Sequence, residues 1–188
     1  MTNKLPEKPA GAGVEDAVAP SGQTRCGFVT IIGAPNAGKS TLVNALVGAK
    51  VSIVSRKVQT TRMPVRGISM SGDSQLVFID TPGIFAPRRR LDRAMVESAW
   101  SGVGDADIVA LIVDAARGVD EDVERILGKL KVTNAQLVLL LNKVDRVRDK
   151  AELLKLASGL NEVVPFERVF MVSALNNSGV EDFRTYLA

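Results

Sequence analysis

The sequence predicts an α/β fold with an open, mostly parallel sheet of about six strands and helices on both faces. From Arg25 onward, short β-rich runs alternate with helical patterns, as a doubly wound sheet requires. Several runs, such as residues 109–113, are continuously apolar, which is typical of strands that are buried on both faces. Polar and glycine-containing segments follow these runs directly, at the carboxyl edge where sheets of this kind bind ligands.

The expected elements keep this alternation along the chain. The apolar strand at 28–32 enters a glycine-rich segment, and the helix at 39–47 leaves it. Strands at 65–70 and 75–79 come next, followed by a helix at 90–101. The strand at 108–113, the helix at 121–131, the strand at 137–141 and the helix at 150–160 continue the pattern. A last strand at 169–172 precedes a short helix at 180–187.

Composition limits the domain organisation and the class of protein. Residues 1–24 are rich in Pro, Gly and Ala and show no sustained period, so we expect a flexible leader before one domain at 25–188. Cys26 is the only cysteine, and no apolar run approaches the roughly 20 residues that cross a bilayer, which together favour the cytoplasm. The chain has no histidine, so oxygen-ligated hard cations remain while the usual general base and histidine metal ligands are excluded.

The segment between the first strand and the first helix has the pattern of a phosphate-binding loop. Its glycines allow successive N–H groups to point inward at phosphates, and the following helix adds the positive end of its dipole. We expect Lys39 to reach the outer phosphates of a nucleoside triphosphate and Ser40 to offer its hydroxyl to magnesium. The residues predicted to bind are Gly33, Ala34, Pro35, Asn36, Ala37, Gly38, Lys39, Ser40 and Thr41.

A second polar segment follows the strand at 75–79. Asp80 at the strand end can hold magnesium through a water, and the N–H of Gly83 can contact the terminal phosphate. Asp, Pro and Gly are also ordinary turn residues, so a simple turn is the alternative, but the upstream phosphate loop favours function. The expected binding residues are Asp80, Thr81, Pro82, Gly83 and Ile84.

The segment after the strand at 137–141 predicts which base is bound. The carboxylate of Asp145 can accept hydrogen bonds from the ring N–H and the exocyclic amine of guanine, a donor pair that adenine lacks, so GTP is favoured over ATP. Asn142 would either bridge loops or contact the purine, and the Lys143 stem would cover a base face. The alternative is a polar loop after a strand. Backbone N–H groups after the last strand would face the guanine oxygen, from Ser173, Ala174 and Leu175.

These motifs together resemble those of translation-factor-type small GTPases, and they look most like those of the bacterial Era family. GAPNAGKST, QTTR, DTPG, NKVD and SAL occur in the family's order and approximate spacing, and the run SIVSRKVQTTR at 52–62 is especially similar to Era. The resemblance covers the chain from about residue 27 to its end, and it implies the G domain of a P-loop NTPase.

The resemblance implies a switch and magnesium-dependent GTP hydrolysis. The QTTR loop is formed here by Gln59, Thr60, Thr61 and Arg62. In this family one threonine of the loop contacts magnesium and the terminal phosphate only in the GTP state. Thr61 is the candidate and Thr60 the alternative, while exposed loop threonines without a role are a third interpretation. Ser40 and Thr61 would bind the metal directly and Asp80 through water. Catalysis would depend on Lys39, Thr61 and Gly83, because charge on the transferring phosphate must be neutralised.

The resemblance has two consequences for the hydrolytic step. Many GTPases orient the attacking water with a glutamine at the position of Ile84, and a hydrophobic side chain cannot polarise water. Slow hydrolysis would then depend on backbone groups, a partner or a potassium ion. Asn36 occupies the place of the potassium-binding asparagine of related GTPases, so potassium activation is the resulting hypothesis.

The resemblance also implies partners beyond the nucleotide. Full-length Era-like proteins continue into a KH domain that binds the end of small-subunit ribosomal RNA, act in 30S subunit assembly and 16S rRNA maturation, and associate with the inner membrane surface. No GXXG clamp follows the nucleotide motifs, so we expect a GTPase domain from a longer protein. We also expect a monomer. Basic residues near the switches predict either an RNA contact or a solvated surface: Arg56, Lys57, Arg62, Arg66, Arg88, Arg89, Arg90 and Arg93.

Two alternatives to an Era-type GTPase share these residues. One is a binding module in which GTP and GDP change the shape of the protein for a partner, with negligible hydrolysis. The other is a related GTPase of the tRNA-modifying or tandem-domain type, which differs in its partner.

Overall fold

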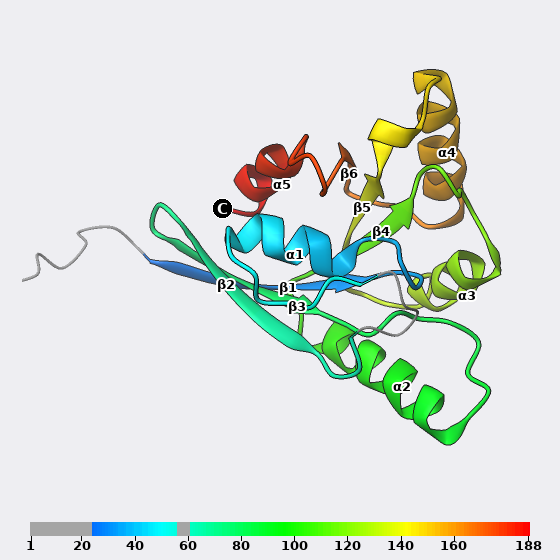
Figure 1. The fold of residues 1–188 in the computed structure, drawn as a ribbon, viewed down its shortest axis with the longest axis horizontal. Coiled ribbons are helices and arrows are strands. Elements are labelled where there is room, and N and C mark those ends of the chain that lie inside the picture. The colour runs from blue at the N-terminus through cyan, green and yellow to red at the C-terminus, as the bar shows by residue number, and fades with distance from the viewer. Residues whose placement is uncertain (1–23, 56–60) are drawn as a thin grey trace, which may run out of the picture.

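The computed structural model describes residues 24–55 and 61–188, and it confirms the predicted α/β class. Figure 1 shows the six strands in one sheet between layers of helices. The strands are β1 (Arg25–Ile32), β2 (Val65–Ser71), β3 (Ser74–Asp80), β4 (Ile108–Asp114), β5 (Gln136–Asn142) and β6 (Arg168–Val172). The helices are α1 (Lys39–Val47), α2 (Arg90–Gly104), α3 (Glu121–Leu130), α4 (Lys150–Val163) and α5 (Val180–Leu187), with a short 3-10 helix η1 (Val144–Arg146) after β5.

The order of the strands places the end of β1 at the centre of the sheet. The order is β2-β3-β1-β4-β5-β6, and all neighbours are parallel except β2 and β3, which form an antiparallel pair. β1 lies between β3 and β4, and successive crossovers place later strands first on one side of β1 and then on the other, so the strand order reverses at β1. Crevices at the carboxyl ends of strands at such a reversal are where open α/β sheets bind ligands.

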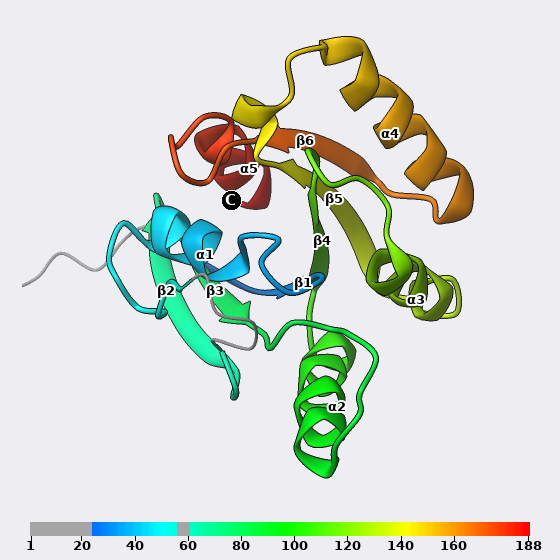
Figure 2. The same cartoon turned by 45° about the vertical axis from the view of Figure 1, so that its right-hand side comes forward.

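The alternation of side chains along the strands explains the continuously apolar runs. In β4, Val109, Leu111 and Val113 pack with α2, α3 and α4, whereas Ala110 and Ile112 pack on the opposite face with α1 and α5. Figure 2 shows these two helix layers on either side of the sheet. Because both faces of the central strands are covered, neither face requires polar residues, as the sequence predicted.

Several elements extend beyond their predicted bounds. β1 begins at Arg25 rather than near residue 28, because the backbone of residues 25–27 pairs with Ser74–Leu76 of β3 although the side chains are not buried. α2 continues past residue 101 because Val103 still contributes to the core. α3 ends one residue earlier than predicted, with Lys131 as its C-cap. The helix η1 was not predicted, and it lies within the guanine motif.

Most of the predicted leader lies outside the described residues, so the flexible leader at 1–24 stays a prediction. Across 24–55 and 61–188, no helix combines the length and the apolar character needed to span a membrane.

Candidate functional site

The phosphate loop connects β1 to α1, and two of its glycines are required by close packing. A Cβ on Gly33 would lie 2.4 Å from the carbonyl oxygen of Ile112 in β4. Gly38 has a φ of 107°, and a Cβ there would lie 2.2 Å from Nδ2 of Asn142. The loop therefore fits against β4 and the end of β5 only with glycine at these two positions.

Lys39 is buried at the start of α1, inside the curve of this loop. Its Nζ donates hydrogen bonds to the carbonyl oxygens of Gly33 at 3.1 Å and Ala34 at 2.9 Å. Burial lowers the pKa of Lys39 to about 8, and the carboxylate of Asp80 opposes this shift. Negatively charged groups beside this ammonium, such as phosphates, would offset the loss of hydration and favour its charged form.

Three oxygen-bearing side chains from different parts of the chain meet beside Lys39. Ser40 Oγ donates to Asp80 Oδ2 at 2.7 Å, and Thr61 Oγ1 lies 3.1 Å from Ser40 Oγ and 3.3 Å from Asp80 Oδ2. The other carboxylate oxygen of Asp80 is buried without a hydrogen-bond partner among the described residues.

This group of oxygens fits magnesium. Hydroxyl and carboxylate oxygens are the ligands that this hard cation prefers, and it keeps waters and substrate phosphates as further ligands. Within the described residues no cluster of three or more His, Cys, Asp or Glu side chains could hold a metal ion. A metal here would therefore depend on Ser40, Thr61, one carboxylate and oxygens of a bound nucleotide.

The segment after β3 packs tightly against the phosphate loop. Thr81 Oγ1 donates to the carbonyl of Ile31 at 2.8 Å, and a Cβ on Gly83 would lie 2.9 Å from the Cα of Pro35. Pro82 is buried. Ile84 donates its backbone N–H to the carbonyl of Gly33 at 3.1 Å, while its side chain is 1% exposed in the core beneath α2 and α3. The Ile84 side chain therefore faces the core rather than the site.

Asn142 at the end of β5 bridges two loops. Its Nδ2 donates to the carbonyl of Ala37 at 2.8 Å, and its Oδ1 accepts from the N–H of Ala174 at 3.0 Å. Of the two roles expected for Asn142, the structure shows this bridge. The same amide also explains why Gly38 tolerates no Cβ.

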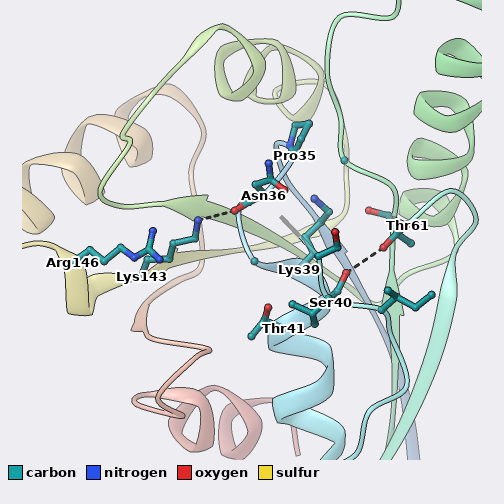
Figure 3. A pocket seen from close by; sticks show the side chains of 14 residues that line it. Pro35, Asn36, Lys39, Ser40, Thr41, Thr61, Lys143 and Arg146 are labelled. Atoms are coloured by element: carbon teal, nitrogen blue, oxygen red, sulfur yellow. Dashed lines mark hydrogen bonds between the residues drawn. The ribbon is translucent and has the colours of Figure 1, made fainter. Parts of the chain in front are cut away.

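The guanine motif continues through Lys143 and Asp145. Lys143 Nζ donates to the carbonyl of Asn36 at 2.7 Å, as the dashed line in Figure 3 shows. Asp145 is exposed, and its Oδ1 accepts a hydrogen bond of 2.5 Å from Ser173 Oγ. Ala174 is buried behind this contact, whereas Leu175 is 73% exposed. The carboxylate that sequence reasoning assigned to base recognition is thus oriented by the loop after β6.

An open pocket of about 410 Å³ lies where these segments meet (Figure 3). Ten of its lining residues were predicted to belong to the site, namely Pro35, Asn36, Gly38, Lys39, Ser40, Thr41, Thr61, Thr81, Gly83 and Lys143. Four were missed by sequence reasoning: Ile53, Val54, Ser55 and Arg146. Arg146 directly follows the guanine motif, and residues 53–55 lie in the run at 52–62 that is similar to Era. These positions were the signal available from the sequence.

The segment that carries three of the missed residues is attached to α1 by one side chain. Asn44 Oδ1 accepts from the N–H groups of Val51 at 2.9 Å and Ser52 at 2.8 Å, and its Nδ2 donates to the carbonyl of Ser52 at 2.8 Å. Asn44 therefore sets the path of the chain that leads to the pocket wall at 53–55.

Other predicted site residues do not line the pocket. Gly33, Ala34, Ala37, Asp80, Pro82, Ile84, Asn142, Ser173 and Ala174 are buried around it, while Arg62, Asp145 and Leu175 are exposed. Gln59 and Thr60 lie outside the described residues, as do Arg56 and Lys57. Thr61 is therefore the described threonine of the QTTR motif. Five basic residues are exposed at the surface, and their RNA contact stays a prediction: Arg66, Arg88, Arg89, Arg90 and Arg93.

Comparison with protein families gives one match. The model of the family described as 50S ribosome-binding GTPase matches residues 28–143, which include the phosphate loop and the start of the guanine motif.

Curated proteins with similar sequences are named GTPase Era. The chain is 61% identical over 174 residues to GTPase Era of Rhizobium meliloti (strain 1021), covering 93% of this chain and 55% of that protein. It is also 61% identical over 166 residues to GTPase Era of Brucella suis biovar 1 (strain 1330), covering 88% of this chain and 53% of that protein. The chain thus spans about half the length of the curated relatives it matches.

Solved structures show the same similarity. The crystal structure of Era in complex with MgGDPNP and nucleotides 1506–1542 of 16S ribosomal RNA has a TM-score of 0.82 and 34% identity, covering 87% of this chain and 56% of that chain. A point variant of Aquifex aeolicus Era bound to GDP·AlF4⁻ has a TM-score of 0.81, also at 34% identity, with the same coverage. The FeoB G-domain from Methanococcus jannaschii, at 24% identity and a TM-score of 0.61, shows a similar fold alone.

Proposed function

The chain belongs to the Era family of GTPases, and we propose that it binds GTP and GDP in the pocket at the end of β1 and hydrolyses GTP to GDP and phosphate as a molecular switch. The observation that carries the proposal is the meeting of Ser40, Thr61 and Asp80 beside the buried Lys39. Ser40 is 21 residues from Thr61 and 40 residues from Asp80 in the sequence. Packing of the core does not require these three polar side chains to meet beside an open pocket.

The described residues would divide the chemistry among them. Magnesium, when bound, links the outer phosphates to the protein and stabilises the negative charge that develops on them. Ser40 and Thr61 would hold it by their hydroxyls, and Asp80 through a water at its unpartnered oxygen. Lys39 would neutralise charge on the transferring phosphate from inside the loop. Release of Thr61 after loss of the terminal phosphate would provide the switch.

Intrinsic hydrolysis should be slow. The pocket-lining residues of the described chain include no carboxylate, glutamine or histidine that could orient the attacking water. The Ile84 side chain, which replaces the glutamine of other GTPases, is buried in the core. Water must then be positioned by backbone groups, by a partner or by a cation.

Single-turnover hydrolysis tests the enzymatic activity. The chain is mixed with less than one equivalent of GTP, and phosphate release is followed with magnesium and with EDTA. We expect slow hydrolysis that needs magnesium and that Asp80→Asn reduces by about a hundredfold or more. Asp149→Asn, which changes an exposed N-cap carboxylate of α4, is the matched control and should leave the rate unchanged. GTP binding without magnesium-dependent hydrolysis would instead favour the binding module.

Potassium is the proposed cation. Asn36 lines the pocket with a φ of 63°, a left-handed conformation that brings its side chain and carbonyl to the rim of the phosphate loop. Hydrolysis in potassium buffer is expected to exceed that in sodium buffer, and Asn36→Ala should remove the difference. Equal rates in the two buffers would remove this part of the proposal.

We infer the biological role from what relatives of this chain bind. A relative of known structure binds magnesium, GDPNP and nucleotides 1506–1542 of 16S ribosomal RNA. We propose that the protein to which this domain belongs acts as a cytoplasmic monomer in 30S subunit assembly and 16S rRNA maturation, with peripheral association with the inner membrane. Filter binding of the full-length protein to the corresponding rRNA segment, with GTP and with GDP, tests the role. Preference for tRNA would favour the related tRNA-modifying GTPases.

A further inference from the structure

Lys143 has an unusual backbone conformation, and its ammonium group is held by two hydrogen bonds. Its φ of 64° lies in the left-handed region, which residues other than glycine rarely adopt. Its ammonium donates to the carbonyl of Asn36 at 2.7 Å and to Oδ2 of Asp114 at 2.5 Å. Asn36 belongs to the phosphate loop, whereas Asp114 belongs to no motif assigned above. The predicted motifs therefore account for the contact of Lys143 with Asn36 but not for its contact with Asp114.

Asp114 is itself held firmly at the end of β4. It lies opposite Asn142 in the β4–β5 register, and the N–H of Ala115 donates to the carbonyl of Asn142 at 2.8 Å. Oδ1 of Asp114 accepts from the N–H of Ala116 at 3.1 Å, which leaves Oδ2 directed at Lys143. The carboxylate is thus oriented by the turn after β4 rather than by Lys143 alone.

We propose that Asp114 is a positioning residue for guanine nucleotide binding. Its carboxylate holds the Lys143 ammonium against the phosphate-loop carbonyl of Asn36, so that the Lys143 stem keeps its place beside the base and the guanine motif keeps its distance from the phosphate loop. This inference rests on the proposed function, since it assigns a role within the same pocket.

The surroundings of the pair allow Asp114 to be changed without separation of the two loops. The side chains of Lys143 and Asp114 are 21% and 18% exposed, so their attraction is screened less than that of a surface ion pair. Asn142 provides a second bridge between the same two regions through the carbonyl of Ala37. Loss of Asp114 should therefore loosen Lys143 at the pocket while the loops stay connected.

Release of fluorescently labelled GDP from the chain tests the proposal. Asp114→Asn keeps an acceptor for Ala116 but removes the charge that faces Lys143. Its GDP is expected to dissociate about tenfold faster, because a Lys143 that is no longer held in place weakens the bound state, and most changes in affinity at a single site appear in the dissociation rate. In a Lys143→Met background, which keeps the alkyl stem, Asp114→Asn should change release by less than about twofold.

A matched control separates positioning from general damage to the loop. Asp120 lies after the same turn, caps α3 through the N–H of Val123 and contacts Arg117 instead of Lys143. Asp120→Asn should lower the melting temperature but leave GDP release unchanged. Unchanged release from Asp114→Asn, the same acceleration in the Lys143→Met background, or equal acceleration by Asp120→Asn would each overturn the inference while leaving the proposed function intact. Failure of the unaltered chain to retain guanine nucleotide would overturn both.

Discussion

At the scale of single residues, the proposed selectivity for guanine would depend on the orientation of the Asp145 carboxylate. Asp145 is exposed and therefore free to rotate in the absence of contacts, but Ser173 Oγ fixes its Oδ1 from the loop after β6. A fixed acceptor can reject bases that lack the matching donors, because the mismatch leaves a polar group unpaired.

Replacement of this acid should change the preferred base. In Asp145→Asn the amide donates where the carboxylate accepted, so guanine loses its partner while the second carbonyl of xanthine gains one. We expect affinity for GDP to fall by about a hundredfold or more, and XDP to bind better than GDP. Calorimetric titration with GDP, XDP and ADP measures this. Unchanged preference for GDP would contradict the assignment of Asp145 to the base.

The buried Lys39 makes nucleotide affinity depend on pH. If phosphates bind beside Lys39 they favour its charged ammonium, so the pKa of Lys39 in the complex should rise above the value of about 8 in the protein alone. Below pH 8 the affinity for GDP should be flat. Above pH 8 the free protein loses a proton that binding must restore, and the Kd should rise by up to about tenfold per pH unit.

Titrations between about pH 6.5 and about pH 8.8 check this linkage. GMP has the same base but no outer phosphate for Lys39 to contact, so its Kd should change much less over this range. A GDP affinity as independent of pH as that of GMP would show that Lys39 does not contact the outer phosphates.

At the scale of elements, α1 positions two parts of the site. Its first turn carries Lys39 and Ser40, and Asn44 near its end holds the chain that leads to the pocket wall at 53–55. The helix thus links the phosphate loop to the segment that precedes the QTTR motif.

Asn44→Ala removes three hydrogen bonds to this segment. We expect a loss of about 1–3 kcal/mol of folding stability, since backbone groups of Val51 and Ser52 lose their partners. The Kd for GDP should rise roughly three- to tenfold, because the pocket wall must then be ordered upon binding.

Asn161 offers a matched control on another helix. Asn161 Oδ1 accepts from the N–H of Phe166 at 3.0 Å, in α4 and away from the pocket lining. Chemical denaturation should show that Asn161→Ala also destabilises the fold, whereas its GDP affinity should equal that of the unaltered chain. Equal weakening of GDP binding by both variants would show that Asn44 acts through overall stability.

At the scale of the whole molecule, the site is assembled from the ends of several strands. Residues that follow β1, β3 and β5 line one pocket, and the loop after β6 orients Asp145. A nucleotide that contacts all of them binds the folded chain and not the unfolded one, so it should stabilise the entire domain.

GDP at a hundred times its Kd should add about 2.7 kcal/mol to the free energy of unfolding. For a domain of this size the melting temperature should rise by about 5–10 °C. Differential scanning calorimetry with GDP, and with ADP at the same concentration as the control, measures the shift. An equal shift with both nucleotides would contradict selectivity for guanine.

The sequence by itself determined the α/β class, the alternation of elements and the family. These properties could be predicted because they depend on local patterns. Apolar runs indicate strands that are buried on both faces, and a phosphate loop needs glycines, a lysine and a hydroxyl residue within a few consecutive positions. The order of the motifs also placed the candidate residues at strand ends.

Only the tertiary structure decided which distant residues support the site. No sequence motif predicted the ion pair between Asp114 and Lys143, the hydrogen bonds from Asn44 to residues 51–52, or the contribution of residues 53–55 to the pocket wall. The start of β1 at Arg25 likewise depends on pairing with β3 rather than on apolar side chains. The Asp114–Lys143 pair and the β1–β3 pairing join segments that are far apart in the chain. They depend on strand order and register, which local residue patterns do not specify.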